Sequence, residues 1–262
     1  MRQLGPIEVE RSGHGVTVGV RRVGALQLAR SSWGRARLAR KLARAQKAAN
    51  DPFWAPHVVP VRGTPTVLVS PWVDTGSGPS AAERAFLRRQ LDRVGAPPEE
   101  PTTDLLDWEE LRPDWADVGV EDHVLDAFEG ALRDLRLPVT STHGDLHSGN
   151  MGVTSGGRVG IIDWEMYTPR GSYLFDVVNY ELHALCRDTG GRWEAMLPRL
   201  RHDPLVATAA SAWRAPVPHL LLGYVVHRLG RQTWLLGGTH RGSAEKLDRH
   251  AATLRSAVHA LA

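Results

Sequence analysis

Our expectations of the fold rest on two stretches of sequence, Thr-His-Gly-Asp-Leu-His-Ser-Gly-Asn at residues 142–150 and Ile-Ile-Asp-Trp-Glu at residues 161–165. Asp145 lies in a polar loop, and Asn150 follows it five positions later. The apolar residues before Asp163 are typical of a short strand that ends at this aspartate. Two carboxylates and a carboxamide in this order suit phosphoryl transfer. One carboxylate accepts the proton of a hydroxyl, while the other carboxylate and the amide oxygen hold magnesium against a triphosphate.

This pair of motifs resembles that of the aminoglycoside phosphotransferase and choline kinase-like family, which shares the protein kinase fold. Protein kinases carry His-Arg-Asp-x-x-x-x-Asn and Asp-Phe-Gly at the matching places. The resemblance implies that Asp145 is the catalytic base, that Asn150 is a magnesium ligand and that Asp163 is the main magnesium ligand. An acidic turn before a buried strand would explain the same residues without catalysis, but five residue types at fixed offsets favour the family.

The fold implied by the resemblance is a two-lobed α+β fold of the protein kinase type, with its active site in the cleft between the lobes. We expect a nucleotide-binding lobe at residues 1–73, with a small five-stranded sheet and one helix at residues 32–49. Residues 74–262 are expected to form the mainly helical catalytic and acceptor-binding lobe. The strands of the first lobe are predicted at residues 6–11, 16–23, 25–30, 57–61 and 66–70, from β-branched runs between turns.

Helices of the second lobe are indicated by capping signals and apolar periodicity. Ser80 and Glu83 form a capping-box pattern at the first of them, and the acidic residues 99–120 are expected to be irregular. The resemblance implies that residues 143–150 form the catalytic loop, and that Asp176 begins a helix and braces this loop. The helices are predicted at residues 80–94, 121–135, 191–213, 216–236 and 242–261.

The resemblance also implies where a nucleotide binds. Residues 13–15, Gly-His-Gly, would be the glycine-rich loop over the triphosphate or a plain hairpin turn, and both interpretations stay open. Trp72 lies just after the last strand, where the family has the hinge whose backbone pairs with the purine base. We therefore expect Trp72 to contact the nucleotide. Backbone recognition does not distinguish ATP from GTP.

The first lobe lacks one group that kinase-fold enzymes carry, a lysine on the third strand paired with a glutamate on the next helix. The helix at residues 32–49 contains no acidic residue, and none of the three lysines falls on a predicted strand. Arg30 ends the third predicted strand, so we expect its guanidinium to contact the phosphates instead. Arg37 and Lys41 on the helix are the next candidates.

This departure leaves three hypotheses open. The first is an active phosphotransferase with a remodelled nucleotide clamp, and the second is a degenerate kinase-fold protein that binds a ligand without catalysis. The complete set of Asp145, Asn150 and Asp163 favours the first. The third, ranked last because no known module accompanies it, is nucleic-acid binding by a basic helix face formed by Arg35, Arg37, Arg40, Lys41 and Arg44.

The charges of the chain are distributed unevenly. Residues 11–50 contain ten Lys or Arg and no Asp or Glu, whereas residues 99–134 contain thirteen Asp or Glu and two Arg. This pattern indicates one site for phosphates and another for a cationic acceptor, or two solvated surfaces of opposite sign. The single cysteine, Cys186, excludes an internal disulfide and favours a reducing compartment.

We therefore expect a cytoplasmic enzyme without a membrane partner. It would use Mg²⁺ with ATP or GTP as the phosphoryl donor. Its acceptor would be a hydroxyl of a small molecule, such as an aminoglycoside or other antibiotic, an amino alcohol or a sugar.

Overall fold

The computed structural model describes residues 2–4, 7–12, 15–21, 23–75, 80–117, 119–154, 157–235 and 244–261. The chain divides into two compact units. The first consists of Met1–Phe86 and His143–Pro169, and the second of Leu87–Thr142 and Arg170–Ala262. Packing therefore groups both sequence motifs with the N-terminal sheet, whereas the lobes predicted from the sequence divide the chain once, after residue 73.

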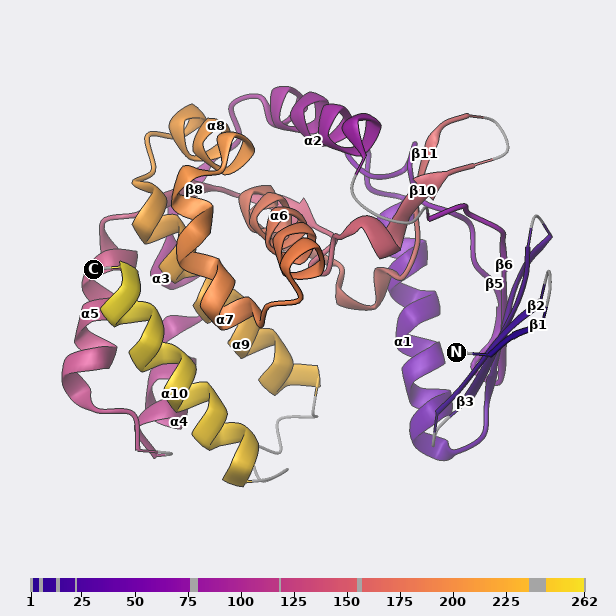
Figure 1. Ribbon diagram of the computed structural model, residues 1–262, viewed down its shortest axis with the longest axis horizontal. Coiled ribbons are helices and arrows are strands. Elements are labelled where there is room, and N and C mark those ends of the chain that lie inside the picture. Colours follow the sequence, from indigo (N-terminus) through magenta and orange to yellow (C-terminus); the bar gives the residue numbers. More distant parts are fainter. Residues whose placement is uncertain are drawn as a thin grey trace. The chain divides into compact units, whose positions relative to one another are not determined.

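The first unit is built on a six-stranded antiparallel sheet with the strand order β1-β2-β3-β4-β6-β5 (Figure 1). Alternate residues of a strand face opposite sides, so the register sorts the side chains into two faces. Gln27 lies opposite Thr17 and Leu68 on one face, and Leu26 lies opposite Val18 and Val69 on the other. The strands are β1 (Arg2–Leu4), β2 (Ile7–Arg11), β3 (Gly15–Val20), β4 (Gly24–Ala29), β5 (Arg62–Thr64) and β6 (Val67–Pro71).

Helix α1 (Ser32–Ala49) lies along one face of this sheet (Figure 1). Its start is capped by Ser31, whose hydroxyl accepts a hydrogen bond from the Gly34 N–H at 3.0 Å. Leu38, Lys41 and Ala45 are buried, whereas the apolar Leu42 is only half-buried. The helix thus carries a cation into its packed face.

The predicted strand at residues 57–61 is wrong. Val58 makes only an isolated bridge with Ile161. The Val59 N–H donates to the Ile161 carbonyl at 3.0 Å, and the Ile161 N–H donates to the His57 carbonyl at 2.7 Å. Pro60 then follows, and it has no N–H to continue a ladder. This segment therefore supports the strand before Asp163 instead of joining the sheet.

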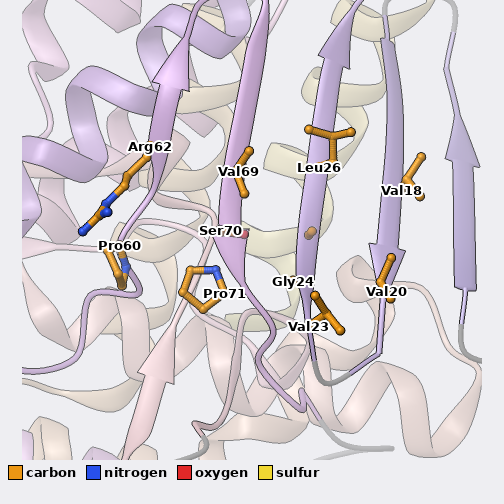
Figure 2. A pocket seen from close by; sticks show the side chains of 11 residues that line it. Val18, Val20, Val23, Gly24, Leu26, Pro60, Arg62, Val69, Ser70 and Pro71 are labelled. Carbon is orange, nitrogen blue, oxygen red and sulfur yellow. The ribbon is translucent and has the colours of Figure 1, made fainter.

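The sheet face opposite α1 is open and apolar. Val18, Leu26 and Val69 lie side by side on it and line a cavity of about 630 Å³ (Figure 2). Val69 is 49% exposed, so this face contributes little to the core of the unit.

In the first unit, the two sequence motifs lie on and around a short hairpin that has a turn of 3₁₀ helix on each side. The strands β10 (Met151–Val153) and β11 (Val159–Ile161) form an antiparallel hairpin. A single turn of 3₁₀ helix precedes it as η1 (Ser148–Asn150), and another follows as η2 (Trp164–Met166). The predicted strand before Asp163 is thus present.

Helix α2 (Ala81–Val94) begins with the predicted capping box. The Glu83 N–H donates to the Ser80 hydroxyl and the Ser80 N–H donates to the Glu83 carboxylate, both at 3.1 Å. Each residue satisfies an N–H that the first turn of a helix leaves unpaired.

The second unit is mainly helical, and its core is formed by α5 and α9 with α6 and α10 (Figure 1). Asp176 lies buried in the first turn of α6, as expected for a residue that begins a helix. No helix in the described ranges is both long and apolar enough to span a bilayer. The helices of this unit include α5 (Asp122–Arg133), α6 (Tyr173–Thr189), α8 (Pro204–Ala212), α9 (Val217–Leu235) and α10 (Ala244–Leu261).

Two predictions for this unit were wrong. Residues 99–120 are not irregular but form α3 (Thr102–Leu105) and α4 (Trp108–Asp117), and the buried rings of Trp108 and Trp115 pack edge to face with their centroids 5.7 Å apart. The helix predicted at residues 191–213 is divided into α7 (Trp193–Met196), η3 (Leu197–His202) and α8. Pro198 and Pro204 each lack the N–H that a continuous helix requires.

Candidate active site

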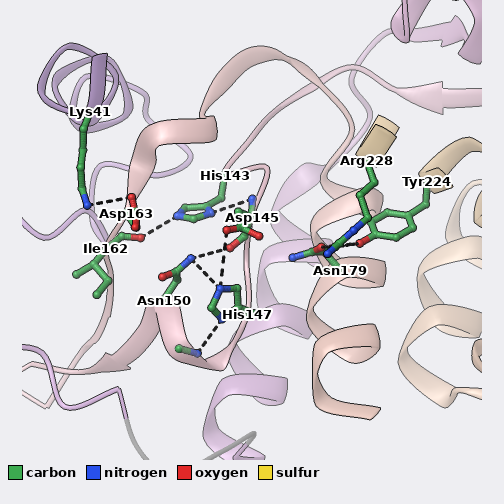
Figure 3. A network of polar contacts seen from close by, with 11 residues as sticks. Lys41, His143, Asp145, His147, Asn150, Ile162, Asp163, Asn179, Tyr224 and Arg228 are labelled. Atoms are coloured by element: carbon green, nitrogen blue, oxygen red, sulfur yellow. Dashed lines mark hydrogen bonds and ion pairs between the residues drawn. The ribbon is translucent and has the colours of Figure 1, made fainter. Parts of the chain in front are cut away.

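The catalytic loop is organised around the buried ring of His143. Its Nε2 donates to the Ile162 carbonyl at 2.9 Å, and its Nδ1 accepts from the Asp145 N–H at 3.2 Å. Both contacts require a neutral ring with its proton on Nε2. Burial lowers the pKa of His143 to about 4 and so favours this neutral form. One histidine thus ties the loop of Asp145 to the strand that leads to Asp163 (Figure 3).

Asn150 is held by its amide nitrogen. This nitrogen donates to the Asp145 carbonyl at 2.9 Å and lies 3.1 Å from His147 Nε2. His147 in turn accepts from the Gly149 N–H at 3.0 Å through Nδ1. With the nitrogen directed into the loop, the Asn150 oxygen is the atom left to bind a cation. The Asp145 side chain is 46% exposed.

Asp163 is placed by the β10–β11 hairpin. The Ile162 N–H donates to the Asn150 carbonyl at 2.9 Å, which joins this strand exit to the catalytic loop. The Trp164 ring is fully buried and donates through Nε1 to the Ile161 carbonyl at 3.0 Å. The predicted site residues Asp145, Asn150 and Asp163 therefore belong to one network within a single compact unit.

A lysine of α1 contacts Asp163 directly. Lys41 Nζ lies 3.0 Å from Asp163 Oδ1 (Figure 3). The aspartate side chain is 35% exposed, but its Oδ1 is buried. Burial alone would raise the pKa of this carboxyl group, and the charge and hydrogen bond of Lys41 outweigh that effect, so the pKa is lowered. Asp163 is thus held as a carboxylate.

Glu165 binds the same helix at two further points. The Arg37 guanidinium donates to its carboxylate at 2.8 Å, and Arg44 donates to its backbone carbonyl at 2.6 Å. Arg37, Lys41 and Arg44 are spaced so that they follow one face of α1. Three cations of the helix therefore contact residues 163–165.

This set was missed in the sequence, although a signal was present. Basic residues at positions 37, 41 and 44 lie at helical spacing, and acidic residues occupy positions 163 and 165. The hypothesis of a basic face for nucleic acid is weakened by the same contacts, because three of its five members are bound within the protein.

The other predicted nucleotide-binding residues are placed as follows. Arg30 lies immediately after β4 and is exposed. Trp72 follows β6 and is half-buried. The neighbouring Asp74 pairs through its backbone with Val153 at 3.2 and 3.4 Å. Residues 13 and 14 of the proposed glycine-rich loop lie outside the described residues.

The donor set suits magnesium that arrives with a nucleotide. Mg²⁺ prefers oxygen ligands and commonly takes one or two carboxylates, with phosphates and waters completing its shell. Asp163 and Asn150 supply one carboxylate and one amide oxygen, and Asp163 already holds a positive charge at 3.0 Å. Within the described parts of the chain, no group of three His, Cys, Asp or Glu side chains could hold a metal by itself.

Solved structures with the same fold cover nearly the whole chain. The macrolide 2′-phosphotransferase MphH from Brachybacterium faecium is 17% identical, with a TM-score of 0.57 over 95% of this chain and 91% of that one. A choline/ethanolamine kinase family protein from Mesorhizobium loti is 16% identical, with a TM-score of 0.50 over 98% and 92%. The GDP and kanamycin complex of APH(2″)-IIIa is 13% identical, with a TM-score of 0.52 over 98% and 94%.

Comparison by sequence gives a consistent result. No curated protein matches the chain significantly. The family model described as the phosphotransferase enzyme family matches residues 20–212, which include the catalytic loop, Asp163 and helix α1. These residues make up most of the chain and carry the kinase-like fold, and the protein therefore belongs to the phosphotransferase enzyme family.

Proposed function

We propose that this protein transfers the terminal phosphoryl group of ATP or GTP to a hydroxyl group of a small molecule, with Mg²⁺ as cofactor. The observation that carries the proposal is the network of Asp145, Asn150 and Asp163, which hydrogen bonds of the catalytic loop hold together. Phosphoryl transfer depends mainly on positioning and on charge stabilisation, and this network supplies both.

Each of the three residues has a distinct role in the proposal. Asp145 orients the acceptor hydroxyl and takes its proton, since it is an exposed carboxylate in the loop. Asp163 and Asn150 would hold the magnesium ion, whose charge would offset the negative charge of the donor phosphates. The backbone beside Trp72 pairs with the purine base, in accord with its place just after β6.

The donor and acceptor classes are proposed from fold neighbours and from charge. Neighbouring structures hold GDP with kanamycin in one case and AMP in another. The helices α3 and α4 carry exposed acids that would attract a cationic acceptor. We therefore favour an aminoglycoside or an amino alcohol over a neutral sugar, and a cytoplasmic location.

The test has two stages, because binding and transfer are separate properties. Thermal unfolding with ATP and with GTP, each with and without Mg²⁺, should show a shift that requires the metal. Labelled terminal phosphate should then move from the bound nucleotide to an acceptor in a panel of kanamycin, a macrolide and choline.

Asp145→Asn is the matched control. It should keep magnesium-dependent binding and lose transfer by about 10² to 10⁴-fold, the usual contribution of a positioned base. Magnesium-dependent binding without transfer to any hydroxyl acceptor would support the alternative of a non-catalytic binding protein. Transfer by Asp145→Asn at the parent rate would remove Asp145 from the mechanism.

A further inference from the structure

We infer that helix α1 supplies the phosphate-binding cation of this enzyme, and that Lys41 takes the place that kinase-fold enzymes give to a strand lysine. The inference rests on the proposed function. It moves to the helix the role that the sequence predicts for Arg30. Three observations carry it: the strand residue that faces α1, the position of Lys41, and the way in which α1 is held.

The residue of β4 that faces α1 is Gln27. Together with Thr17 it lines a cavity of about 70 Å³, which Arg37 and Lys41 of the helix also line. Because alternate residues face opposite sides of a strand, position 27 is where a strand lysine would reach this cavity. A glutamine carries no charge, and Arg30 lies beyond the strand and is exposed. The strand therefore supplies no cation at this point.

Lys41 supplies one from the helix. The residue is 9% exposed and its ammonium group lies 3.0 Å from Asp163. An ammonium group has three N–H donors, so the contact with Asp163 leaves it able to donate to phosphate oxygens as well. When Asp163 holds a magnesium ion, the terminal phosphates of the donor would lie next to it. A cation beside the main magnesium ligand is thus within reach of those phosphates.

The helix is anchored on both sides of Lys41. Arg37 lies one turn before it and Arg44 lies about one turn after it, and both bind Glu165. Kinase-fold enzymes pair a strand lysine with a helix glutamate. Here the strand carries the neutral Gln27, the helix carries the lysine, and the acidic partner of that lysine is Asp163 itself. A lysine is therefore still delivered to the site, from the helix instead of the strand.

Calorimetry with magnesium-bound ATP and GTP tests this inference. Lys41→Met should weaken nucleotide binding at least about tenfold, the low end for a charge-assisted contact. Lys47→Met is the matched control, because it removes an exposed lysine from the same helix, and it should bind as the parent does. Moving the lysine, in the double variant Gln27→Lys/Lys41→Met, should recover part of the loss.

Binding by Lys41→Met that equals or exceeds that of the parent overturns the inference. Tighter binding would identify Lys41 as a counter-ion that competes with magnesium for Asp163. If the parent binds no nucleotide, the proposed function fails as well. If Lys41→Met still binds nucleotide and transfers phosphate as the parent does, the inference is refuted and the proposed function stands.

A second test uses the parent protein, so it does not depend on how a variant folds. A nucleotide acylated on its terminal phosphate reacts with an amine that lies beside that phosphate. The amine nitrogen bonds to the acyl carbon, the bond from that carbon to the phosphate oxygen breaks, the nucleotide leaves, and the amine proton passes to water. Mass spectrometry should find the acyl group on Lys41 and not on Lys47, and unmodified nucleotide should prevent the labelling. A label on Lys47 without one on Lys41 overturns the inference.

Discussion

At Asp163 the backbone adopts the left-handed conformation, with φ 62° and ψ 55°. This conformation costs an ordinary residue roughly 1–2 kcal/mol, and Asp and Asn are among the few that visit it routinely. The residues on each side are fixed, since the Ile162 carbonyl is bound by His143 and the Trp164 ring is fully buried. The surroundings thus impose a strained turn at the residue that we propose as the main magnesium ligand.

Two substitutions separate the charge of Asp163 from its backbone conformation. Asp163→Asn and Asp163→Ala should both lose magnesium-dependent nucleotide binding, because both remove the carboxylate. Asp163→Ala should in addition be destabilised, because alanine adopts the left-handed conformation less readily than asparagine does. Its free energy of unfolding should be lower by about 1 kcal/mol than that of Asp163→Asn. Calorimetry and urea unfolding measure the two effects, and Asn150→Ala should reduce binding less than either. If Asp163→Asn binds the magnesium-bound nucleotide as tightly as the parent does, Asp163 is not the metal ligand.

His143 should make stability depend on pH. Its pKa of about 4 in the folded protein lies below the usual value of about 6.5 for an unfolded chain. Between these values the unfolded state binds more protons, so stability should be complete above about pH 6.5 and fall as the pH drops toward 4. This one group should contribute a loss of roughly 2 kcal/mol between pH 7.5 and pH 5.

The measurement compares the parent with His143→Gln by urea unfolding at several pH values. The variant is expected to be less stable near neutrality because it loses the buried contacts. Its deficit should shrink as the pH falls, since glutamine does not titrate. A deficit that stays constant from pH 7.5 to pH 5 would show that burial does not hold His143 neutral.

At the scale of elements, the contact between α1 and η2 fixes the geometry of the site. The helix approaches η2 through Arg37, Lys41 and Arg44. Tyr167, at the end of η2, donates its hydroxyl to Asp51 at 2.9 Å, just beyond the end of α1. The helix thus controls where the cation meets Asp163.

A double-mutant cycle tests the strength of this contact. Arg37→Ala and Glu165→Ala should each lower the free energy of unfolding, and the double variant should lose less than their sum. We expect a coupling energy of about 0.5–1 kcal/mol, because the Arg37 side chain is 45% exposed and water screens the pair. Arg35→Ala is the control, since this exposed residue of the same helix should show no coupling to Glu165. Additive effects within error would mean that the pair does not hold α1 in place.

At the scale of the whole molecule, the acidic region is partly neutralised by arginines. Arg170 pairs with Glu100, Arg112 binds acids of α5, and Arg255 binds Glu121 at 2.6 Å. A second group of acids, on α3, on α4 and in the turn between them, is exposed, and we expect these to attract a cationic acceptor. They are Asp104, Asp107, Glu109 and Glu110.

Neutralising these four acids, to Asn or Gln, should raise the KM for a cationic acceptor by about fivefold while leaving kcat unchanged. Added salt should raise the parent KM and reduce the difference, because it screens exposed charges. Asparagine keeps the left-handed backbone of Asp107, whose φ is 52°. The control is Asp92→Asn/Asp188→Asn, which removes exposed acids elsewhere. If the control variant raises the KM as much as the four-residue variant does, the attraction comes from the overall charge of the protein and not from these four acids.

Much of the fold and of the catalytic loop could be predicted, because the signals are local. Asp145, Asn150 and Asp163 lie close together in sequence, and short hydrogen bonds between neighbouring segments bring them together. The Ser80 capping box was readable for the same reason. Errors arose where a distant partner decides. The segment at residues 57–61 pairs with Ile161, and Trp108 of the acidic region packs against Phe128 of α5 with ring centroids 6.3 Å apart.

The cation at Asp163 could not be identified from local pattern. In the sequence, Arg30 looked better placed than Lys41, since it ends a strand and Lys41 lies on a helix rich in arginine. The packing of α1 on the sheet and on η2 turns Lys41 inward and leaves Arg30 exposed. Local spacing specifies which residues share a helix face. Which element that face meets depends on contacts between segments more than a hundred residues apart, and no local spacing encodes them.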